Sequence, residues 1–265
     1  MSSKGKGVKD VPVGETQGHR STADRSFWDR MSGIVEENHH SMAHVLSLFP
    51  TYVRRQQLTR FLAHYELFKM AVDLPGNFVE IGVYRGSSFF TWHKLMETFC
   101  ATDRRRRVFG FDHFQGLSDF HAKDGAYDAK DGKVPGGFDT QAVRSELLSL
   151  INLHNDDNLI PGAPRSHLIE GNVKQTLPRF LEDQPGLRIS LLHLDADLYE
   201  PTLAALEYLW PRVVNGGVVV FDEYGLMPWE GESRAADEYF GRIGYKPTWR
   251  RFPWSTQPQG YLVKQ

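Results

Sequence analysis

Acidic side chains follow two apolar segments in the second half of the chain, at the point where each segment ends. Asp195 and Asp197 follow the first segment, and Asp222 and Glu223 follow the second. Both segments are typical of buried strands in a parallel sheet, where ligands bind beyond the carboxyl ends of the strands. The carboxylates therefore predict one acidic site, and a set of oxygen ligands suits Mg²⁺ or Mn²⁺. Helix caps are the structural alternative, but they explain one acidic step better than two.

A glycine turn in the first half of the chain is a second candidate site. A short apolar run leads into Gly82 and Gly86, and a helical pattern then begins at Ser87 or Ser88, either of which is suited to cap the helix. Glycines let the backbone approach a ligand closely, and the N–H groups at a helix start attract negative charge. Glu80 lies within the apolar run, so its carboxylate requires a cation or a polar partner. An ordinary strand–helix turn is the plain alternative to a nucleotide-type site.

The next predicted strand, 107–111, ends at Asp112. A carboxylate at the tip of the second strand in a β–α–β unit is well placed to accept hydrogen bonds from a ribose diol. The glycine pattern upstream lacks the third glycine of the dinucleotide fingerprint, which disfavours an NAD site. A turn carboxylate without a ligand is the alternative. His193 lies inside a later strand and is expected to be a core histidine and not a base.

The order of the predicted elements indicates an α/β fold. Helical patterns at 25–48 and 51–72 precede the first strand, and helices follow most of the strands. The expected strands are 78–81, 107–111, 166–169, 188–194, 218–221, 244–250 and 260–263. The last two would form a closing hairpin that supplies one antiparallel strand. We therefore expect a Rossmann-like, mostly parallel seven-stranded sheet with an antiparallel edge strand and N-terminal helical additions.

Three segments of different character divide the chain. Residues 1–24 are rich in Gly, Ser, Lys and Thr and are expected to form a flexible tail. Residues 25–75 are expected to form a helical cap, and residues 76–265 the ligand-binding domain. Within this domain the polar, glycine-rich stretch 113–140 is too long for an ordinary connection, so it predicts a mobile lid or substrate loop.

The composition narrows the partners that the chain can have. Its 265 residues suit one α/β domain with additions, and 31 basic against 33 acidic residues give a net charge of −2. A general nucleic-acid binder would be basic, so the arginines at 104–107 are expected to be a solvated approach to the next strand. Cys100 is the only cysteine, which excludes an internal disulfide and fits a reducing compartment. With no apolar run of membrane length and no secretion signal, we expect a soluble, cytoplasmic protein with no nucleic-acid or membrane partner.

Five motifs resemble those of the class I S-adenosylmethionine-dependent methyltransferases, and more narrowly those of the macrocin O-methyltransferase family. The motifs are VEIGVYRGSS (79–88), GFDHFQGL (110–117), EGNVKQTLP (170–178), LHLDADLYEPT (192–202) and GGVVVFDEYG (216–225). The resemblance covers roughly residues 51–238, and the pair LDADLYEPT and FDEY is its most specific part. It implies the Rossmann-like fold of class I methyltransferases and a family that includes sugar methyltransferases of antibiotic and surface-glycan pathways.

The resemblance also implies the residues of the site. The cofactor S-adenosyl-L-methionine would lie against Glu80, Gly82, Tyr84, Arg85, Ser88, Asp112, Gly171, Asn172 and Asp195. Within this set Asp112 would hold the ribose, while Gly171 and Asn172 would lie near the adenine. A divalent metal ion, Mg²⁺ or Mn²⁺, would be held by Asp195, Asp222 and Glu223. Many family members carry an aspartate where this chain has Glu223 and an acidic residue where it has Asn172.

The function implied is transfer of a methyl group to a hydroxyl of a small molecule, first of all a sugar or a nucleotide-linked sugar. A sugar hydroxyl is a poor nucleophile, and a divalent metal ion lowers the pKa of an oxygen that it binds. Asp195 is the first candidate for receiving the proton, and Asp197 is the second. The helices before the first strand suit an oligomer contact, so we expect at least a homodimer. The alternatives are a non-catalytic nucleotide-binding or assembly protein that keeps the fold, and a methyltransferase of a catechol-like or macromolecular acceptor.

Overall fold

The computed structural model describes residues 21–118 and 120–265, which belong to two compact units, Met1–Thr59 and Arg60–Gln265. Residues 1–20 of the predicted tail, 1–24, lie outside the described residues. The remaining residues of that segment begin helix α1 (Ser21–Glu37). The sequence predicted a domain boundary at 75/76, whereas the compact units divide between Thr59 and Arg60. The difference arises because helix α4 (Arg55–Ala71) contributes buried side chains to the core of the larger unit.

The smaller unit consists of α1, α2 (Met42–Ser47), α3 (Phe49–Tyr52) and the first residues of α4. The sequence predicted one helical segment at 25–48, but α1 ends at Glu37 and His39 takes a left-handed conformation with φ 52°. A new helix starts after Ser41, whose side-chain oxygen accepts a hydrogen bond from the amide of His44. The predicted segment is therefore a series of short helices.

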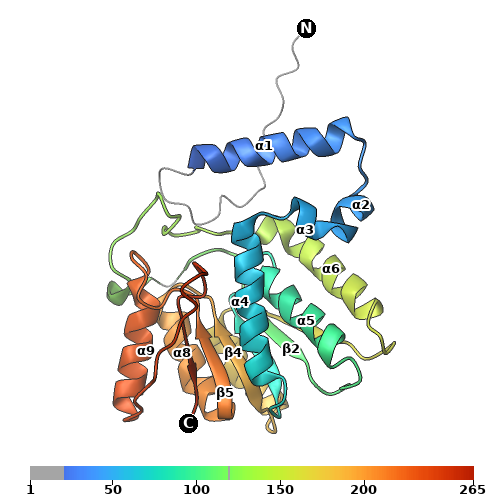
Figure 1. The fold of residues 1–265 in the computed structure, drawn as a ribbon. Coiled ribbons are helices and arrows are strands. Elements are labelled where there is room, and N and C mark those ends of the chain that lie inside the picture. The colour runs from blue at the N-terminus through green and yellow to red at the C-terminus, as the bar shows by residue number, and fades with distance from the viewer. Residues whose placement is uncertain (1–20, 119) are drawn as a thin grey trace. The chain divides into compact units, whose positions relative to one another are not determined.

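A six-stranded sheet forms the centre of the larger unit (Figure 1). In chain order its strands are β1 (Asn77–Ile81), β2 (Val108–Asp112), β3 (Ser166–Glu170), β4 (Ile189–Leu194), β5 (Val213–Phe221) and β6 (Gly260–Val263). Their order across the sheet is β3-β2-β1-β4-β5-β6, and all neighbours are parallel except β6, which runs antiparallel to β5. The strand order reverses between β1 and β4, and ligands of open α/β sheets bind at such a switch point. The predicted Rossmann-like fold with one antiparallel edge strand is confirmed.

The sixth of the seven predicted strands, 244–250, is not a strand in the structure. Of the described residues in this stretch, only Arg250 pairs with the sheet, through an isolated bridge to Tyr261. Pro247 lacks the N–H that a strand ladder requires, and the ring of Trp249 stacks on Tyr224 with 3.6 Å between the centroids. The stretch therefore covers the core with aromatic side chains and does not extend the sheet.

Two groups of helices cover the two faces of the sheet (Figure 1). On one face α5 (Ser87–Phe99) and α6 (Arg144–Asp156) pack together with the buried side of α4, and on the other lie α7 (Val173–Asp183), α8 (Tyr199–Leu209) and α9 (Glu230–Arg242). Successive strand residues alternate between the faces, so that Phe78 joins the core under α4 and α5 while Val79 joins the opposite core. Polar residues at matching positions of neighbouring strands consequently meet on one face, as Glu80 and His193 do in the core.

The predicted lid, 113–140, is anchored to the larger unit in its described part. Asp124 is fully buried, and its carboxylate accepts a hydrogen bond of 2.7 Å from the amide of Tyr199 at the start of α8. The Lys133 ammonium is equally buried and lies 3.2 Å from the Glu230 carboxylate at the start of α9. Mobility of this segment remains a prediction, and these two anchors limit the part of the segment that is able to move.

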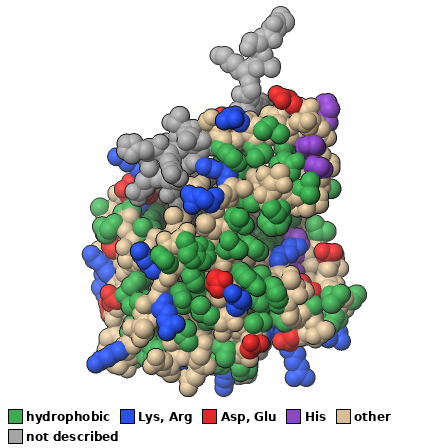
Figure 2. Space-filling model, viewed as in Figure 1, with side chains coloured by type: hydrophobic (Ala, Val, Ile, Leu, Met, Phe, Trp, Pro, Cys, Tyr) green, Lys and Arg blue, Asp and Glu red, His purple; other side chains and the backbone are tan. Residues whose placement is uncertain are grey.

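The surface carries both charges. On the face shown in Figure 2, Lys and Arg side chains are scattered among acidic and hydrophobic ones. One arginine of the basic run is not solvated as the sequence predicted, because Arg106 is 9% exposed and donates hydrogen bonds to the backbone oxygens of Val72 (2.6 Å) and Leu74 (2.7 Å). These bonds satisfy carbonyl groups just beyond the end of α4. Within 21–118 and 120–265, no helix has the length and apolar character needed to cross a membrane.

Candidate active site

A cleft opens at the carboxyl ends of β1, β2 and β4, where the strand order reverses. The predicted site residues that line it are Gly82, Tyr84, Asp112, Gly171, Asn172, Asp195 and Asp197. Apolar side chains complete the wall, among them Phe111, Leu198 and Pro201. The fold thus brings most of the residues expected for the cofactor into one cavity together with both candidate catalytic aspartates.

Asp112 holds the glycine turn in place. Its Oδ2 accepts hydrogen bonds from the amides of Val83 (2.9 Å) and Tyr84 (2.8 Å), and its Oδ1 accepts one from the amide of Phe114 (2.7 Å). The carboxylate at the tip of β2 therefore fixes the backbone that follows β1. A turn role and a ligand role are compatible, because each carboxylate oxygen can accept more than one hydrogen bond.

Gly82 is required by a close approach of two strand ends. It takes a φ of +88°, and a Cβ atom built on it would lie 1.8 Å from the backbone oxygen of Asp195. Only glycine allows β1 to turn away this close to the end of β4. The predicted helix cap needs correction: Gly86, with φ 83°, occupies the N-cap position of α5, and Ser87 and Ser88 form its first turn.

Glu80 and Ser88 do not line the cleft. The Glu80 side chain is fully buried and accepts hydrogen bonds from the Ser88 hydroxyl (2.8 Å) and the Trp92 indole (2.7 Å). The polar partner that its burial demands is therefore supplied by α5 and not by a ligand. Arg85, the remaining residue of the expected cofactor set, is exposed and also lies outside the cleft lining.

His193 lies between two buried carboxylates. Strand register pairs it with Glu80 across β1 and β4, with 3.2 Å between Nδ1 and Oε2, and its Nε2 lies 3.4 Å from Oδ1 of Asp222. Burial alone would lower the pKa of His193, but the hydrogen bonds to Asp222 and Glu80 raise it to about 10. His193 is therefore a paired imidazolium inside the core, which agrees with the expectation of a core histidine.

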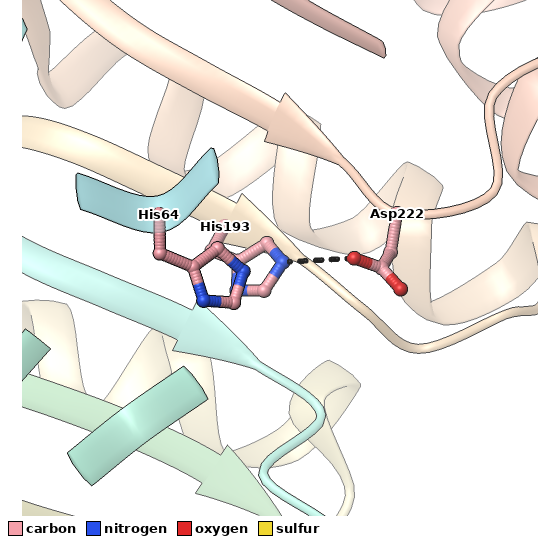
Figure 3. A group of neighbouring side chains, drawn as sticks. All are labelled: His64, His193 and Asp222. Atoms are coloured by element: carbon pink, nitrogen blue, oxygen red, sulfur yellow. Dashed lines mark hydrogen bonds and ion pairs between the residues drawn. The ribbon is translucent and has the colours of Figure 1, made fainter. Parts of the chain in front are cut away.

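His64, His193 and Asp222 form a group with the residue types of a transition-metal site (Figure 3). The His64 ring projects from α4, 5.5 Å from the His193 ring between centroids. A protonated His193 has no lone pair for a metal, because both of its nitrogens donate to carboxylates. Burial, with His193 and Arg60 nearby, lowers the pKa of His64 well below its usual range, so this ring is neutral. The group is thus a core contact between α4 and the sheet.

Oxygen atoms of Asp195, Asp197 and Glu223 form a second group, in which one ligand atom from each lies within 4.8 Å of the others. The Glu223 side chain is 3% exposed, and its Oε1 accepts a hydrogen bond of 2.9 Å from Gln257. Its Oε2 is buried without a hydrogen-bond partner among the described residues. A buried carboxylate oxygen without a partner is costly, and a cation beside it would satisfy it.

Burial and like charges oppose the ionisation of these acids. Burial and the neighbouring Asp222 raise the pKa of Asp195 and of Glu223 well above their usual ranges, and they raise that of Asp197 to about 7. Asp222 is the exception: although burial opposes ionisation, Arg60 and His193 lower its pKa to about 2. The donor set is entirely carboxylate oxygen and short of positive charge, so it fits a hard divalent cation.

Asp197 has an unusual backbone. Its φ is +62°, the left-handed region that residues other than glycine seldom adopt, at the step from β4 into α8. Such conformations concentrate at functional sites, because the surrounding structure has to hold them in place. Together with its place in the oxygen group of Asp195 and Glu223, this makes Asp197 a candidate ligand or proton acceptor beside the predicted metal set of Asp195, Asp222 and Glu223.

Sequence reasoning missed three residues that contact the acidic group. Arg60 bridges Asp195 and Asp222, Gln257 binds Glu223, and the fully buried Glu232 accepts a hydrogen bond of 3.0 Å from the Glu223 amide. A signal existed for Arg60, which lies one helical turn before His64 on the buried side of α4. Gln257 comes from an irregular segment before β6, for which no periodicity applies.

The family of the chain follows from a match over most of its length. A model of the Macrocin-O-methyltransferase (TylF) family matches residues 48–242. The chain belongs to the macrocin O-methyltransferase family. The motifs that carried the resemblance, from the glycine turn to Asp222 and Glu223, all lie inside the matched residues.

Curated relatives are methyltransferases of bacterial natural products. The chain is 31% identical over 184 residues to the 8-demethyl-8-(2,3-dimethoxy-alpha-L-rhamnosyl)-tetracenomycin-C 4'-O-methyltransferase of Streptomyces olivaceus, a match that covers 66% of this chain and 62% of that protein. It is also 31% identical over 167 residues to the demethyldecarbamoylnovobiocin O-methyltransferase of Streptomyces niveus, which covers 63% of this chain and 59% of that protein. These matches span about three fifths of the length of the relatives.

Solved structures agree with this assignment. The crystal structure of CalS11, a calicheamicin methyltransferase, has a TM-score of 0.82 and 28% identity over 99% of each chain. The structure of the O-methyltransferase NovP, with a TM-score of 0.57 and 23% identity over 78% of each chain, shares the fold. The larger unit of this chain thus has the class I methyltransferase fold.

Proposed function

We propose that the chain is an S-adenosylmethionine-dependent O-methyltransferase that methylates a hydroxyl of a sugar in natural-product biosynthesis with the help of a divalent metal ion. The observation that carries the proposal is a single cleft that contains the glycine turn, Asp112 at the tip of β2, and the aspartates that follow β4. In such a cleft the methyl donor would lie next to an acceptor hydroxyl that the aspartates hold. Relatives whose names include a rhamnosyl acceptor and calicheamicin support a sugar-bearing acceptor.

The residues of the cleft suit the nucleoside of the cofactor. Asp112 Oδ1 accepts a single backbone hydrogen bond, so it retains capacity for a ribose hydroxyl. Gly171, with φ +130°, and Asn172, which caps α7 by accepting from the Lys174 amide (3.0 Å), leave the space beyond β3 without a bulky side chain. These residues would orient the cofactor, and the acidic side chains around Asp195 would favour its positive sulfonium group.

The acidic group would hold Mg²⁺ or Mn²⁺. Asp195, Asp197 and Glu223 form one set of neighbouring oxygens, and Arg60 Nη2 contacts both Asp195 and Asp222. When bound, the ion would lower the pKa of the acceptor hydroxyl and hold a neighbouring hydroxyl in register. The buried Glu223 oxygen without a partner and the raised pKa values of the group support this assignment.

Asp195 is our first candidate for the proton acceptor, and Asp197 is the second. Both line the cleft, and the Asp195 side chain is 21% exposed, so an acceptor hydroxyl can reach it. Burial and the neighbouring Asp222 raise the pKa of both aspartates, and a base whose pKa approaches the working pH transfers protons effectively. Leu198 and Pro201 line the cleft beside them, and their apolar side chains would help to keep water away from the reacting atoms.

Mass spectrometry tests the proposal directly. Purified protein, S-adenosylmethionine and Mg²⁺ would be incubated with a panel of nucleotide-linked sugars, glycosylated aglycones and catechols. We expect one added methyl group on a sugar hydroxyl and none when Asp195 and Asp197 are both changed to Asn. A methylated catechol with no methylated sugar would show that the acceptor is a catechol and not a sugar. Failure to bind S-adenosylhomocysteine would contradict the proposal that the chain is a methyltransferase.

A non-catalytic nucleotide-binding or assembly protein is less well supported. Such a protein would gain nothing from burying Glu223 and Glu232, each of which has an oxygen without a hydrogen-bond partner among the described residues. Burial and the neighbouring Asp222 raise the pKa of both groups well above their usual ranges, and perturbed acids of this kind gather at functional sites.

We also propose a cytoplasmic homo-oligomer of at least two chains. The single cysteine supports a reducing compartment. In the smaller unit Met42 and Leu46 are 72% and 63% exposed, an arrangement that a second copy would cover. Light scattering should give at least twice the chain mass, and Leu46→Glu should reduce it towards the mass of one chain.

A further inference from the structure

Arg60 is the first residue of a stripe of side chains on α4 that faces the core. The stripe consists of Arg60, His64, Leu67, Phe68 and Ala71, which follow one another at helical spacing. The last four are at most 1% exposed, whereas the Arg60 side chain is 25% exposed. Because the stripe faces the sheet, the guanidinium is directed at the acidic side chains beyond β4 and β5.

The guanidinium contacts the predicted metal ligands. Its Nη2 donates to Oδ2 of Asp195 at 3.0 Å and to Oδ2 of Asp222 at 3.1 Å. Its Nη1 donates to Oε1 of Gln257 at 2.5 Å, and Nε2 of the same glutamine donates to Glu223 at 2.9 Å. One side chain therefore engages two of the predicted ligands directly and the third through Gln257. The planar fork of an arginine makes these contacts together, which the single ammonium of a lysine would not.

Nη2 contacts one oxygen of Asp195 and one oxygen of Asp222. It lies at about equal distances from the Asp195 and Asp222 oxygens, so an ion that joined the same two oxygens would need the space that Nη2 fills. The second oxygen of Asp222 is also engaged, by His193 at 3.4 Å. Asp222 is thus already paired on both sides.

We propose that Arg60 is the resident cation of the metal-free site and must leave Asp195 and Asp222 before these carboxylates could hold a divalent ion. This inference rests on the metal site proposed above. Withdrawal is feasible because the Arg60 side chain is partly exposed and has a flexible stem. The exchange replaces one positive charge by two, which suits a group of carboxylates that Arg60 alone does not neutralise. Arg60 would in this way set the affinity of the site for metal.

Mn²⁺ binding to the full chain tests the exchange without any turnover. Calorimetry and the electron paramagnetic resonance of free Mn²⁺ would be compared for the parent protein, Arg60→Gln and Arg60→Lys. We expect Arg60→Gln to bind Mn²⁺ at least about tenfold more tightly, because a unit charge no longer competes at two ligands. Arg60→Lys keeps the charge and should stay closer to the parent protein. The matched control is Arg55→Gln, an exposed arginine of the same helix, which should leave Mn²⁺ affinity unchanged.

Equal or weaker Mn²⁺ binding by Arg60→Gln, with S-adenosylhomocysteine binding intact, would overturn the exchange and leave the metal site standing. No Mn²⁺ binding by either protein would overturn both. A second measurement avoids variants in which the fold is lost. In the parent protein the guanidinium hydrogens of Arg60 should give resolved ¹⁵N–¹H signals in chelator, and saturating Mg²⁺ should remove them. Signals that persist unchanged in saturating Mg²⁺ would overturn the exchange as well.

Discussion

Glu80 and His193 occupy paired positions on β1 and β4 and meet in the core, with 3.2 Å between Oε2 and Nδ1. The other ring nitrogen of His193 reaches Asp222 beyond β5, so one imidazolium joins three neighbouring strands. Neither the Glu80 nor the His193 side chain is exposed. The strand that leads into the glycine turn is thereby tied to the strand end that carries the acidic pair.

Removing the imidazolium should destabilise the fold strongly. His193→Leu would leave the Glu80 and Asp222 carboxylates without their shared partner, and breaking a buried pair in this way costs about 3–5 kcal/mol. Urea unfolding would measure the free energy of unfolding. Ser190→Ala is a suitable control on the same strand, because Ser190 is fully buried and its hydroxyl donates a long hydrogen bond of 3.5 Å to the Asn77 backbone oxygen. A loss for His193→Leu no larger than that for Ser190→Ala would contradict the pairing.

Asp112 should be needed for cofactor binding. Asp112→Ala removes the acceptor that fixes the Val83 and Tyr84 amides and the expected acceptor for the ribose. Loss of hydrogen bonds to a charged group should weaken S-adenosylhomocysteine binding by about 1.5–3 kcal/mol. Calorimetry would compare it with Asp183→Ala, an exposed carboxylate at the end of α7. Unchanged affinity in Asp112→Ala would remove Asp112 from the site.

The residues at the strand ends could be found from the sequence because parallel strands must share an edge. Apolar runs located β4 and β5, and the acids that follow each run then had to lie close together, as Asp195 and Asp222 do on either side of one guanidinium nitrogen. The antiparallel edge strand at 260–263 was predicted as part of a closing hairpin, and in the structure it pairs with β5. The extra strand at 244–250 was predicted wrongly because aromatic residues that pack on a core resemble strand residues in composition.

The direction of a side chain could not be found in this way. Whether Glu80 faces the cleft or the core depends on the register between β1 and β4, and no spacing within one strand reveals that register. Ser88 was expected to cap a helix or contact the cofactor, but its hydroxyl donates to Glu80 at 2.8 Å. Arg60 and Gln257 reach the acidic group from segments far apart in the chain, so only the folded structure brings them together.

A buried histidine should make stability depend on pH. Burial, with Lys94 and His154 adding to it, lowers the pKa of His93 to about 4. In the unfolded chain a histidine has a pKa of about 6.5. Between these values the unfolded chain binds a proton that the folded chain does not. The free energy of unfolding should therefore fall as the pH decreases through this window, by up to about 3 kcal/mol for this side chain.

His93→Gln removes that titration and should flatten the dependence of the unfolding free energy on pH below neutrality. Urea unfolding at several pH values would measure the slope. His39→Asn changes an exposed histidine in a left-handed conformation that asparagine tolerates, so it should keep the parent slope. Identical slopes for the parent and His93→Gln would show that His93 does not titrate abnormally.

The lid should depend on its buried lysine. Lys133→Met keeps the length of the side chain but leaves the Glu230 carboxylate and two backbone oxygens without their donor. Amide hydrogen exchange across 120–140 should become at least about tenfold faster than in the parent protein. The segment can then open locally without the cost of breaking these bonds. Lys130→Met, at an exposed position of the same segment, is the matched control. In the parent protein, protection should rise further when cofactor and acceptor are bound, and full protection without ligands would mean that the segment is structural.

Asp195 and Asp222 should respond differently to added metal. Chelation should abolish methyl transfer and leave S-adenosylhomocysteine binding nearly intact, and Mg²⁺ or Mn²⁺ should restore turnover. Asp222 is paired to His193 and Arg60, so Asp222→Asn should act through metal affinity and be partly rescued by excess metal. Asp195 lines the cleft and is the first candidate for receiving the proton, so Asp195→Asn should stay slow at saturating metal. Rates of both variants would be measured against metal concentration. Rescue of both variants would mean that Asp195 is only a metal ligand and does not receive the proton. Full turnover in chelator would leave the same carboxylates to act by acid–base chemistry alone.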